Sequence, residues 1–459
     1  MTHFRHGARA PQNFYDKKNY LDYILNEWDD PGELTGMGQR MHFLLGLRNR
    51  IKYIIEEPFL SGKFDPHQIL IYSSSLNRTI ISVSSQLQGL YPQSIKKGET
   101  LSDEQIKISV PQVNIDYPLI KDEISNMSNY ALPNSMILAP VRMINNNEKR
   151  MRLYDTSKCK EKTAEIKKKN GETLETLKNI TAEFKEKYSE KANKLYGKEL
   201  NYDLSFLDNF CDAFISGKTE LKSMSKFKEA QFDMDEIHGF CQRFQVLNFR
   251  DWILGDEEHA VAHLEISKLM NETLHYLKER VDADKINEDI ESKKEDYSRP
   301  KMVMYSGHDT TISCFEVFLM EALNKNISFY KYPQFATQIS LEVVTDKEKK
   351  DAKTDSDYTI NYYFDDENVV SMPMKEFIDK ITPQIWTEDK INNYCGFTDN
   401  KNNESSKQNN LNLYKLCLII FVSLSGVLLI ITIILSVKLI TSGKKESRIY
   451  NSLMPSNEE

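Results

Sequence analysis

The chain lacks an excess of positive charge, a pair of cysteines spaced as CxxC, a cysteine/histidine cluster and an internal repeat. Its 459 residues carry a formal net charge of -8 at pH 7, which argues against a nucleic-acid binder because such proteins need a basic face. Without CxxC or Cys/His patterns there is no signature of a zinc site. The composition, 40% hydrophobic and 28% charged, is that of a folded globular body.

Long apolar runs are also missing, with one exception near the carboxyl end. Leu416 to Val437 carries no charged side chain, and its length suits a helix across a hydrocarbon core of roughly 30 Å. We therefore predict a transmembrane helix over residues 415–438, preceded by a polar stalk (397–414). The short tail (439–459) is basic directly after the span, which favours a cytoplasmic location.

The potential glycosylation sites agree with this orientation, that of a single-pass type I membrane protein. Asn-x-Ser/Thr sequences precede the predicted span, and five of them together favour a lumenal or extracellular body on a cell-surface, endosomal or lysosomal membrane; these five begin at Asn126, Asn179, Asn271, Asn326 and Asn403. Of the six cysteines, Cys417 lies in the span. The other five allow two disulfides and one free thiol in an oxidising compartment, and their pairing stays open.

The body reads as an α/β fold with an insertion. Ile69 to Tyr72 form a short buried-strand run, a serine turn follows, and Thr79 to Leu90 have the pattern of a helix. Residues 301–323 repeat this strand-loop-helix texture, and residues 332–365 alternate like antiparallel strands. We predict a doubly wound mixed sheet in two parts (1–100 and 291–396), separated by a mainly helical cap (101–290).

One helical expectation depends on apolar spacing. Within residues 32–57 the start is loop-like, and apolar side chains then recur at three- and four-residue steps, which predicts a helix; they are Leu44, Leu47, Ile51, Ile54 and Ile55. In the cap, Phe244, Phe249 and Trp252 are expected to be core residues rather than a substrate platform.

Three polar loops carry the chemistry. The first is Arg5-His6-Gly7-Ala8-Arg9, where two guanidiniums flank an imidazole and suit a tetrahedral dianion. Alone it could equally be a basic surface cluster. Arg78 follows the strand before the second helix, at a helix start that favours phosphate, and His308-Asp309 follow another strand.

This set of residues is the inventory that phosphoryl transfer through a phosphohistidine needs. His6 would be the nucleophile, since a neutral imidazole nitrogen attacks phosphorus readily. Arg5, Arg9, Arg78 and His308 would hold the phosphoryl oxygens, while Asp309 would protonate the leaving oxygen. We expect no metal ion and no cofactor, because the arginines supply the charge, and we expect acidic pH to favour turnover by keeping Asp309 protonated and His308 cationic.

The sequence resembles the histidine acid phosphatases, the acid-phosphatase and phytase branch of the histidine phosphatase superfamily. The resemblance rests on RHGARAP (5–11), GELTGMGQRMHFLLGLRNRIKY (32–53), YSSSLNRTIISVSSQLQGLYP (72–92), GHDTTI (307–312) and YPQFATQISLEV (332–343), which occur in the family's order. It implies a phosphoglycerate-mutase-like fold, the same roles for the same six residues, phosphate monoesters as substrates, and a homodimer as an open possibility.

Other readings of the same residues stay open. An enzyme specialised for inositol polyphosphates or lysophospholipids would share these motifs, and so would a catalytically silent binding ectodomain. Phosphoglycerate mutases share only the RHG part of the motif. His259 and His263 lie four residues apart in HAVAH, a spacing that can bind metal, but no third ligand is evident and an ordinary helix face is favoured.

The two ends of the chain complete the expectations. Tyr450-Asn-Ser-Leu453 fits the Tyr-x-x-apolar signal that endocytic adaptors read, and transmembrane lysosomal acid phosphatases are similar in layout. Only four residues precede Arg5, whereas a type I membrane protein needs a signal peptide and this fold needs a full strand there. We therefore expect Met1 to be an internal methionine of a longer chain.

Overall fold

The structure is a computed structural model, and it describes residues 1–12, 28, 30–95, 98–109, 122, 125–144, 159, 162, 164, 171–222, 224–253, 259–285, 300–325, 332–346 and 354–396. The chain separates into two compact units, residues 1–396 and 397–459. The predicted stalk, membrane span and cytoplasmic tail all fall in the second unit, outside the described residues. In the part of the chain that is described, no helix is long and apolar enough to cross a membrane.

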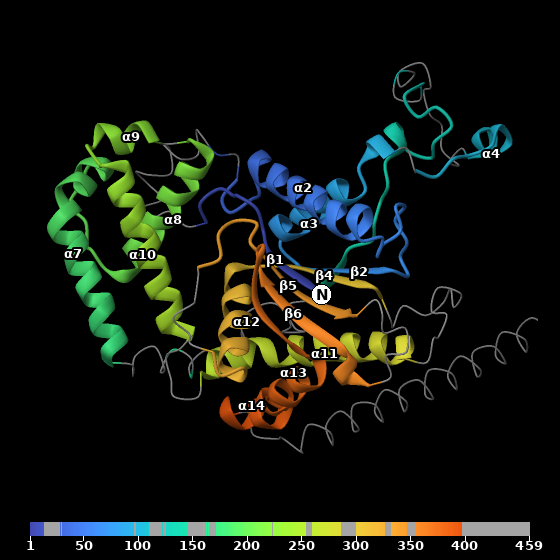
Figure 1. Ribbon diagram of the computed structural model, residues 1–459. Coiled ribbons are helices and arrows are strands. Elements are labelled where there is room, and N and C mark those ends of the chain that lie inside the picture. The colour runs from blue at the N-terminus through green and yellow to red at the C-terminus, as the bar shows by residue number, and fades with distance from the viewer. Residues whose placement is uncertain are drawn as a thin grey trace, which may run out of the picture. The chain divides into compact units, whose positions relative to one another are not determined.

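A mixed seven-stranded sheet organises the first unit (Figure 1). Its spatial order is β3-β2-β4-β1-β5-β6-β7. The strands are β1 (Thr2–Arg5), β2 (Ile69–Ser74), β3 (Arg142–Ile144), β4 (Met302–Gly307), β5 (Gln338–Thr345), β6 (Tyr358–Phe364) and β7 (Glu367–Pro373). The α/β fold with a mixed sheet is thus confirmed.

The direction of the strands divides the sheet in two. β1, β2, β3 and β4 run parallel, with Phe4 opposite Ser306 and Tyr72 opposite Tyr305. β5, β6 and β7 are joined antiparallel, and β5 also lies antiparallel to β1. The central parallel strands β2 and β4 are almost entirely buried, whereas β6 alternates buried and half-buried positions.

Helices cover both faces of the sheet (Figure 1). On one face lie α2 (Gly36–Arg50), extended by a π-helical turn (Ile51–Glu56), and α3 (Asn77–Leu90). On the other lie α11 (Ala260–Lys285), α12 (Asp309–Ala322), α13 (Met374–Ile381) and α14 (Glu388–Tyr394). The short pieces are α4 (Asp103–Ile108) and the 3-10 turns Gln93–Ile95, Pro133–Ser135, Asp355–Asp357 and Thr382–Gln384.

The helix predicted within residues 32–57 is confirmed as α2, and its buried face is polar. Leu44, Ile51 and Ile55 are exposed to about half or more, while His42 and Asn49 are fully buried. The reason is a layer of hydrogen bonds under the helix. His42 Nε2 donates to the Arg5 carbonyl oxygen at 3.1 Å, and Asn49 Nδ2 donates to the Gln338 amide at 3.0 Å. Buried polar groups are tolerated where they are bonded in this way.

A separate group of helices lies beside the sheet, at the left of Figure 1. It comprises α7 (Gly171–Tyr196), α8 (Leu204–Glu220), α9 (Met224–Glu229) and α10 (Met234–Ile253). Aromatic side chains fill its core, among them Phe184, Phe206, Phe210 and Phe227. The boundaries 101–290 for the cap stay a prediction, and two elements within them belong to the sheet layer: β3 pairs with β2, and α11 packs against α12.

Two disulfides and one free thiol are found among the described cysteines, as the cysteine count allowed. Cys211 is bonded to Cys241, which links α8 to α10, and Cys159 is bonded to Cys395. Cys314 is free and buried in α12. The aromatic Phe244 is a core residue of the helical group, as predicted, whereas the side chain of Trp252 lies outside the described residues.

A buried histidine in β1 leads to a prediction about acid stability. His3 is 1% exposed and stacks on Tyr305 with 4.7 Å between ring centroids. Neither ring nitrogen has a hydrogen-bond partner among the described residues. Burial, with a smaller contribution from the Met1 amino group, lowers the pKa of His3 to about 3. The unfolded chain therefore binds this proton near pH 6.5 and the folded protein only near pH 3, so stability is lost as pH falls through that window.

We expect His3→Phe to remove this loss, because phenylalanine keeps the stacking and carries no proton. The free energy of unfolding of the variant should rise relative to wild type by up to about 1.4 kcal/mol per pH unit as pH falls below 6. Denaturant unfolding at several pH values between 7 and 4 measures this difference. Replacement of the exposed His275 by alanine is the control. Parallel stability curves for His3→Phe and wild type would contradict the assignment.

Candidate active site

The three polar loops meet at one edge of the sheet. Arg5 ends β1, Ser74 ends β2 and Gly307 ends β4, and these three strands run parallel. The carboxyl ends of parallel strands lie at the same edge, where ligands bind in open α/β sheets. His6 therefore lies close to His308, with 5.8 Å between their ring centroids.

The first loop is held by close backbone packing. His6 N donates to the Gly307 carbonyl oxygen at 3.1 Å, and Thr35 N donates to the Ala8 carbonyl oxygen at 3.0 Å. A Cβ atom on Gly7 would lie 2.4 Å from the carbonyl oxygen of Gly38 in α2, and a Cβ atom on Gly38 would lie 2.1 Å from that of Ala8. The loop thus requires glycine at both positions so that its backbone can pack on α2.

The hydrogen bond at His6 sets its tautomer. Nδ1 of His6 lies 2.9 Å from the carbonyl oxygen of Gly7. A carbonyl oxygen only accepts, so Nδ1 carries the hydrogen. In a neutral imidazole the other nitrogen, Nε2, then holds the lone pair. The hydrogen bond thus leaves Nε2 as the nitrogen with the available lone pair.

The surroundings keep this imidazole neutral. His6 is 2% exposed, and Arg5 and Arg9 are also buried, so the loop is not a solvated surface cluster. Burial, followed by the charges of Arg5, Arg9, His308 and Arg78, lowers the pKa of His6 well below its ordinary value. The same cations that could bind a phosphate therefore also keep the imidazole unprotonated.

Asp309 is held by three donors. Arg5 Nη2 lies 2.8 Å from Asp309 Oδ2, which also accepts from the Tyr332 hydroxyl at 3.0 Å. Thr310 N donates to the other carboxylate oxygen at 2.8 Å. Arg5 Nη1 is bonded to the Pro333 carbonyl oxygen at 2.6 Å, and Arg5 Nε has no hydrogen-bond partner among the described residues.

These contacts change the expected source of the acidic proton. Burial raises the pKa of Asp309, but Arg5, Arg9, His308 and the Thr310 N–H together outweigh it and hold the pKa below its ordinary value. Asp309 is therefore a carboxylate in mildly acidic solution. The expectation that this residue stays protonated there does not fit the contacts that hold it.

His308 is oriented by a chain of hydroxyls. Its Nε2 lies 2.9 Å from Ser74 Oγ, and Ser74 Oγ lies 2.8 Å from Thr79 Oγ1. The Thr79 hydroxyl donates to the Leu76 carbonyl oxygen at 2.8 Å, so it accepts from Ser74, and Ser74 in turn accepts from His308 Nε2–H. The chain thus fixes a hydrogen on Nε2 and leaves Nδ1 as the variable nitrogen.

The two remaining arginines approach from different elements. Arg78 lies in the first turn of α3, and its Nη1 reaches the Gly32 carbonyl oxygen at 3.4 Å. Arg9 is bonded to Asp212 of α8, with Nη2 to Oδ1 at 2.8 Å and Nη1 to Oδ2 at 3.3 Å. All six residues that the sequence singled out are therefore brought to one edge of the sheet.

Several residues of the site were not singled out from the sequence. Phe335 lies under the Arg5 guanidinium, with 4.5 Å between the guanidinium carbon and the ring centroid, and 5.9 Å from the His6 ring. Phe249 packs against Tyr332 at 5.2 Å and so belongs to the margin of the site rather than only to the core of the helical group. Tyr332 and Phe335 belong to a segment that carries the family resemblance, but the spacing of its residues does not indicate that these rings lie against Arg5 or Phe249.

The two histidines of HAVAH both approach the carboxylate of Glu321. His259 Nδ1 lies 2.8 Å from Glu321 Oε2, and His263 Nε2 lies 3.6 Å from the same oxygen. Burial raises the pKa of Glu321, but the two histidines outweigh it and lower the value to about 2. In the described ranges no three histidine, cysteine or acidic side chains are arranged to hold a metal ion.

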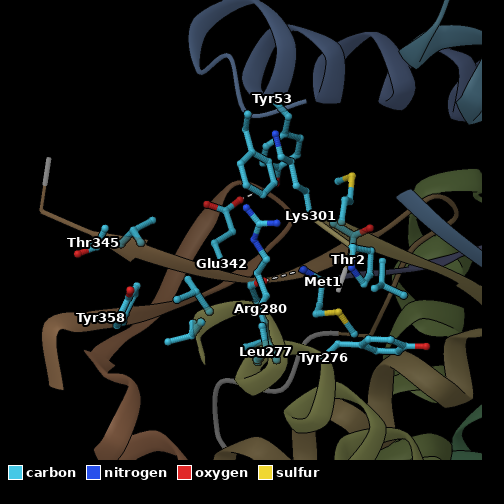
Figure 2. Close-up of a pocket in the computed structure, with 18 of the residues that line it drawn as sticks. Met1, Thr2, Tyr53, Tyr276, Leu277, Arg280, Lys301, Glu342, Thr345 and Tyr358 are labelled. Carbon is cyan, nitrogen blue, oxygen red and sulfur yellow. Dashed lines mark hydrogen bonds between the residues drawn. The ribbon is translucent and has the colours of Figure 1, made fainter. Parts of the chain in front are cut away.

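A cavity of about 220 Å³ lies at the opposite end of β1 (Figure 2). Two of its polar groups are already hydrogen-bonded: the Tyr53 hydroxyl donates to Glu342 at 2.5 Å, and the Met1 amino group donates to the Leu341 carbonyl oxygen at 2.9 Å. His6 follows the carboxyl end of β1, whereas this cavity borders its amino end. The cavity is therefore not part of the His6 site.

A family model now matches the chain across this whole arrangement. The model of the histidine phosphatase superfamily (branch 2) matches residues 4–365. The chain belongs to this family. The match includes all three polar loops as well as the helical group, so the resemblance noted from short motifs extends over nearly the whole first unit.

Individual relatives agree with the family. The chain is 21% identical over 415 residues to prostatic acid phosphatase of Bos taurus, covering 86% of this chain and 88% of that protein. It is 32% identical over 90 residues to lysosomal acid phosphatase of Xenopus laevis, but that match covers only 19% of each chain. Among solved structures, a phytase of Klebsiella shares the fold, with a TM-score of 0.51, 14% identity, and coverage of 84% of this chain and 93% of the phytase.

Proposed function

We propose that this histidine phosphatase hydrolyses phosphate monoesters through a covalent phosphohistidine on His6. The observation that carries the proposal is the neutral, oriented imidazole, with its Nε2 lone pair surrounded by the cations of Arg5, Arg9 and Arg78. A binding-only site for phosphate needs the cations. It does not need an imidazole with one nitrogen tied to a carbonyl oxygen and the other left with its lone pair.

The first step breaks the ester bond. His6 Nε2 attacks phosphorus while the bond to the leaving oxygen breaks, and Asp309 transfers a proton to that oxygen. Charge on the three transferring oxygens is stabilised by Arg5, Arg9, Arg78 and His308. Arg5 changes partner in this scheme, since it pairs with Asp309 in the empty site and with a phosphoryl oxygen in the complex.

The second step returns the enzyme to its starting state. Asp309, now a carboxylate, takes a proton from water as the water oxygen attacks phosphorus. The P–N bond to His6 breaks and the imidazole regains its lone pair. Asp309 passes its proton to the phosphate, which is released as the monoanion, so Asp309 is again a carboxylate. Each turnover consumes one water and needs no other reactant.

The proposal also names a class of substrate. We take simple phosphate monoesters as the substrate class, in line with the acid phosphatases named above. Inositol polyphosphates and lysophospholipid phosphates are the alternatives, and a panel of such esters with the purified catalytic unit distinguishes them by kcat/KM. A protein that binds phosphate but turns over no member of the panel would support a silent binding ectodomain.

The lowered pKa of Asp309 leads to a prediction about pH. Because Asp309 is ionised in the empty enzyme at pH 5, the acidic proton enters with the ester as its monoanion, whose second pKa is about 6. Above that value, kcat/KM should fall about tenfold per pH unit, and the midpoint should follow the ester's own pKa. Profiles for two esters with different second pKa values measure this.

The pH midpoints of kcat/KM for the two esters show which group carries the proton. Midpoints that shift with the ester agree with substrate-borne protonation. A common midpoint for both esters would assign the proton to an enzyme group and would contradict the account of Asp309. Binding of phosphate to the same samples, measured by calorimetry, controls for loss of folded enzyme at the extremes of pH.

We also propose that the catalytic unit is lumenal or extracellular, anchored by the helix at 415–438 and sorted through Tyr450 and Leu453. The apolar run and the tail motif of the sequence support this proposal. Surface labelling of cells that express Tyr450→Ala tests the sorting part, with accumulation at the surface expected. An unchanged distribution would remove Tyr450 from the proposal.

A further inference from the structure

The helical group contributes a carboxylate to the candidate active site. Asp212 lies in the middle of α8, and its two oxygens form a fork with both terminal nitrogens of Arg9. Asp212 Oδ2 also accepts from the backbone N–H of Gln12 at 2.7 Å. These contacts join α8 directly to the loop that follows His6.

Asp212 is placed rigidly. Its neighbour Cys211 is bonded to Cys241 of α10, and Phe210 and Phe214 on the same helix are fully buried in the core of the helical group. Ala10, the residue after Arg9, packs into the same core. The carboxylate therefore approaches Arg9 from a fixed element and not from a long flexible side chain.

The fork decides which edge of Arg9 is available. A bidentate carboxylate fixes the plane of a guanidinium, because two parallel bonds prevent rotation. Arg9 Nη1 has a further bond to the Ala10 carbonyl oxygen at 2.9 Å. Arg9 Nε, by contrast, is buried and has no hydrogen-bond partner among the described residues. The arrangement leaves the Nε–H free to donate to an oxyanion.

We infer that Asp212 is a positioning residue for phosphate recognition: it orients Arg9 so that the Nε–H faces the transferring phosphoryl group. The inference rests on the proposed function, because the oxyanion is taken to be the phosphoryl group of the substrate. It makes the helical group part of the phosphate site and not only a cover over it.

A competing role for the same contact is inhibition. A carboxylate on Arg9 could weaken phosphate binding by neutralising the cation, in which case its removal would tighten binding. A merely structural role is the third possibility, in which Asp212 holds the Gln12 backbone and acts independently of Arg9. The three roles differ in what happens when Arg9 is absent.

A double-mutant cycle of Asp212→Asn and Arg9→Ala tests the inference. We expect Asp212→Asn alone to lower kcat/KM and to weaken binding of inorganic phosphate by roughly tenfold each, the usual size of one charge-assisted hydrogen bond. In the Arg9→Ala background, the same change should alter both quantities by less than about twofold, since coupled residues are not additive. Asp208→Asn, exposed and one turn earlier on α8, is the matched control.

Each other outcome has a definite meaning. Tighter phosphate binding by Asp212→Asn, or an equal loss with and without Arg9, would overturn the inference. If Asp212→Asn does not fold, the cycle is run with Asp212→Glu, which keeps the charge but displaces the fork, and additivity would again overturn it. Calorimetry with inorganic phosphate needs no turnover. An inactive wild type with intact coupling would therefore reject the proposed function and keep the inference.

Discussion

Replacing His6 by alanine is expected to reduce phosphomonoester turnover by ~10³-fold or more, the scale of losses for covalent nucleophiles. Nε2 of His308, the second histidine of the site, is bonded to Ser74, so His308 does not present this nitrogen as His6 does. The four cations would remain, so binding of inorganic phosphate should persist. The measurement is kcat for p-nitrophenyl phosphate near pH 5, together with the phosphate dissociation constant.

The matched control is His3→Ala, three residues before His6 and within β1. His3 is buried against Tyr305 and does not face the phosphate site, so its loss should lower stability while leaving kcat of the folded fraction nearly unchanged. Undiminished turnover by His6→Ala would refute the nucleophile assignment. Loss of phosphate binding together with turnover would instead indicate a collapsed site.

The second large effect is expected at Asp309 and depends on the leaving group. Asparagine can still accept from the Thr310 N–H through its one oxygen, but its Nδ2 cannot accept from the Tyr332 hydroxyl, and the side chain cannot deliver a proton as an acid. For an alkyl phosphate, whose leaving oxygen needs that proton, we expect Asp309→Asn to lower kcat/KM by ~10²–10⁴-fold. For p-nitrophenyl phosphate, which releases a stable phenolate, the loss should be about tenfold or less.

The comparison between esters separates acid catalysis from positioning. Arg5 loses its ion pair in this variant, and a disturbed Arg5 would affect every ester alike. A loss of the same size for both esters would therefore assign Asp309 to holding Arg5 and not to proton transfer. Tyr332→Phe is the matched control. It removes one hydrogen bond to the same carboxylate and leaves Asp309 itself able to transfer a proton.

The candidate site residues could be located from the sequence, whereas the residue that orients Arg9 could not. His6, Arg78 and His308 could be located because each follows a buried strand of the parallel half, and parallel strands bring their carboxyl ends together. Asp212 could not be located, since it lies 203 residues from Arg9 in a helix without a motif. Its role depends on how α8 packs beside the sheet, which no local pattern specifies.

The helix α2 shows a different limit. Its apolar spacing predicts a helix, which the structure confirms, but Leu44 and Ile51 of this pattern are exposed. Polar His42 and Asn49 are buried instead, because partners from Arg5 and Gln338 satisfy their hydrogen bonds. Periodicity measures apolarity and contains no information on such partners, so it is misled wherever a buried layer is polar.

Direct detection of the covalent intermediate tests the central claim most directly. Wild-type protein is mixed with excess phosphate monoester, quenched within milliseconds into alkali, which spares phosphohistidine, and digested for mass spectrometry. The account predicts one phosphoryl group on the peptide that contains His6, its loss on acid treatment, and its absence in His6→Ala. Turnover without any phosphorylated peptide, or a phosphoryl group on a different residue, would contradict it.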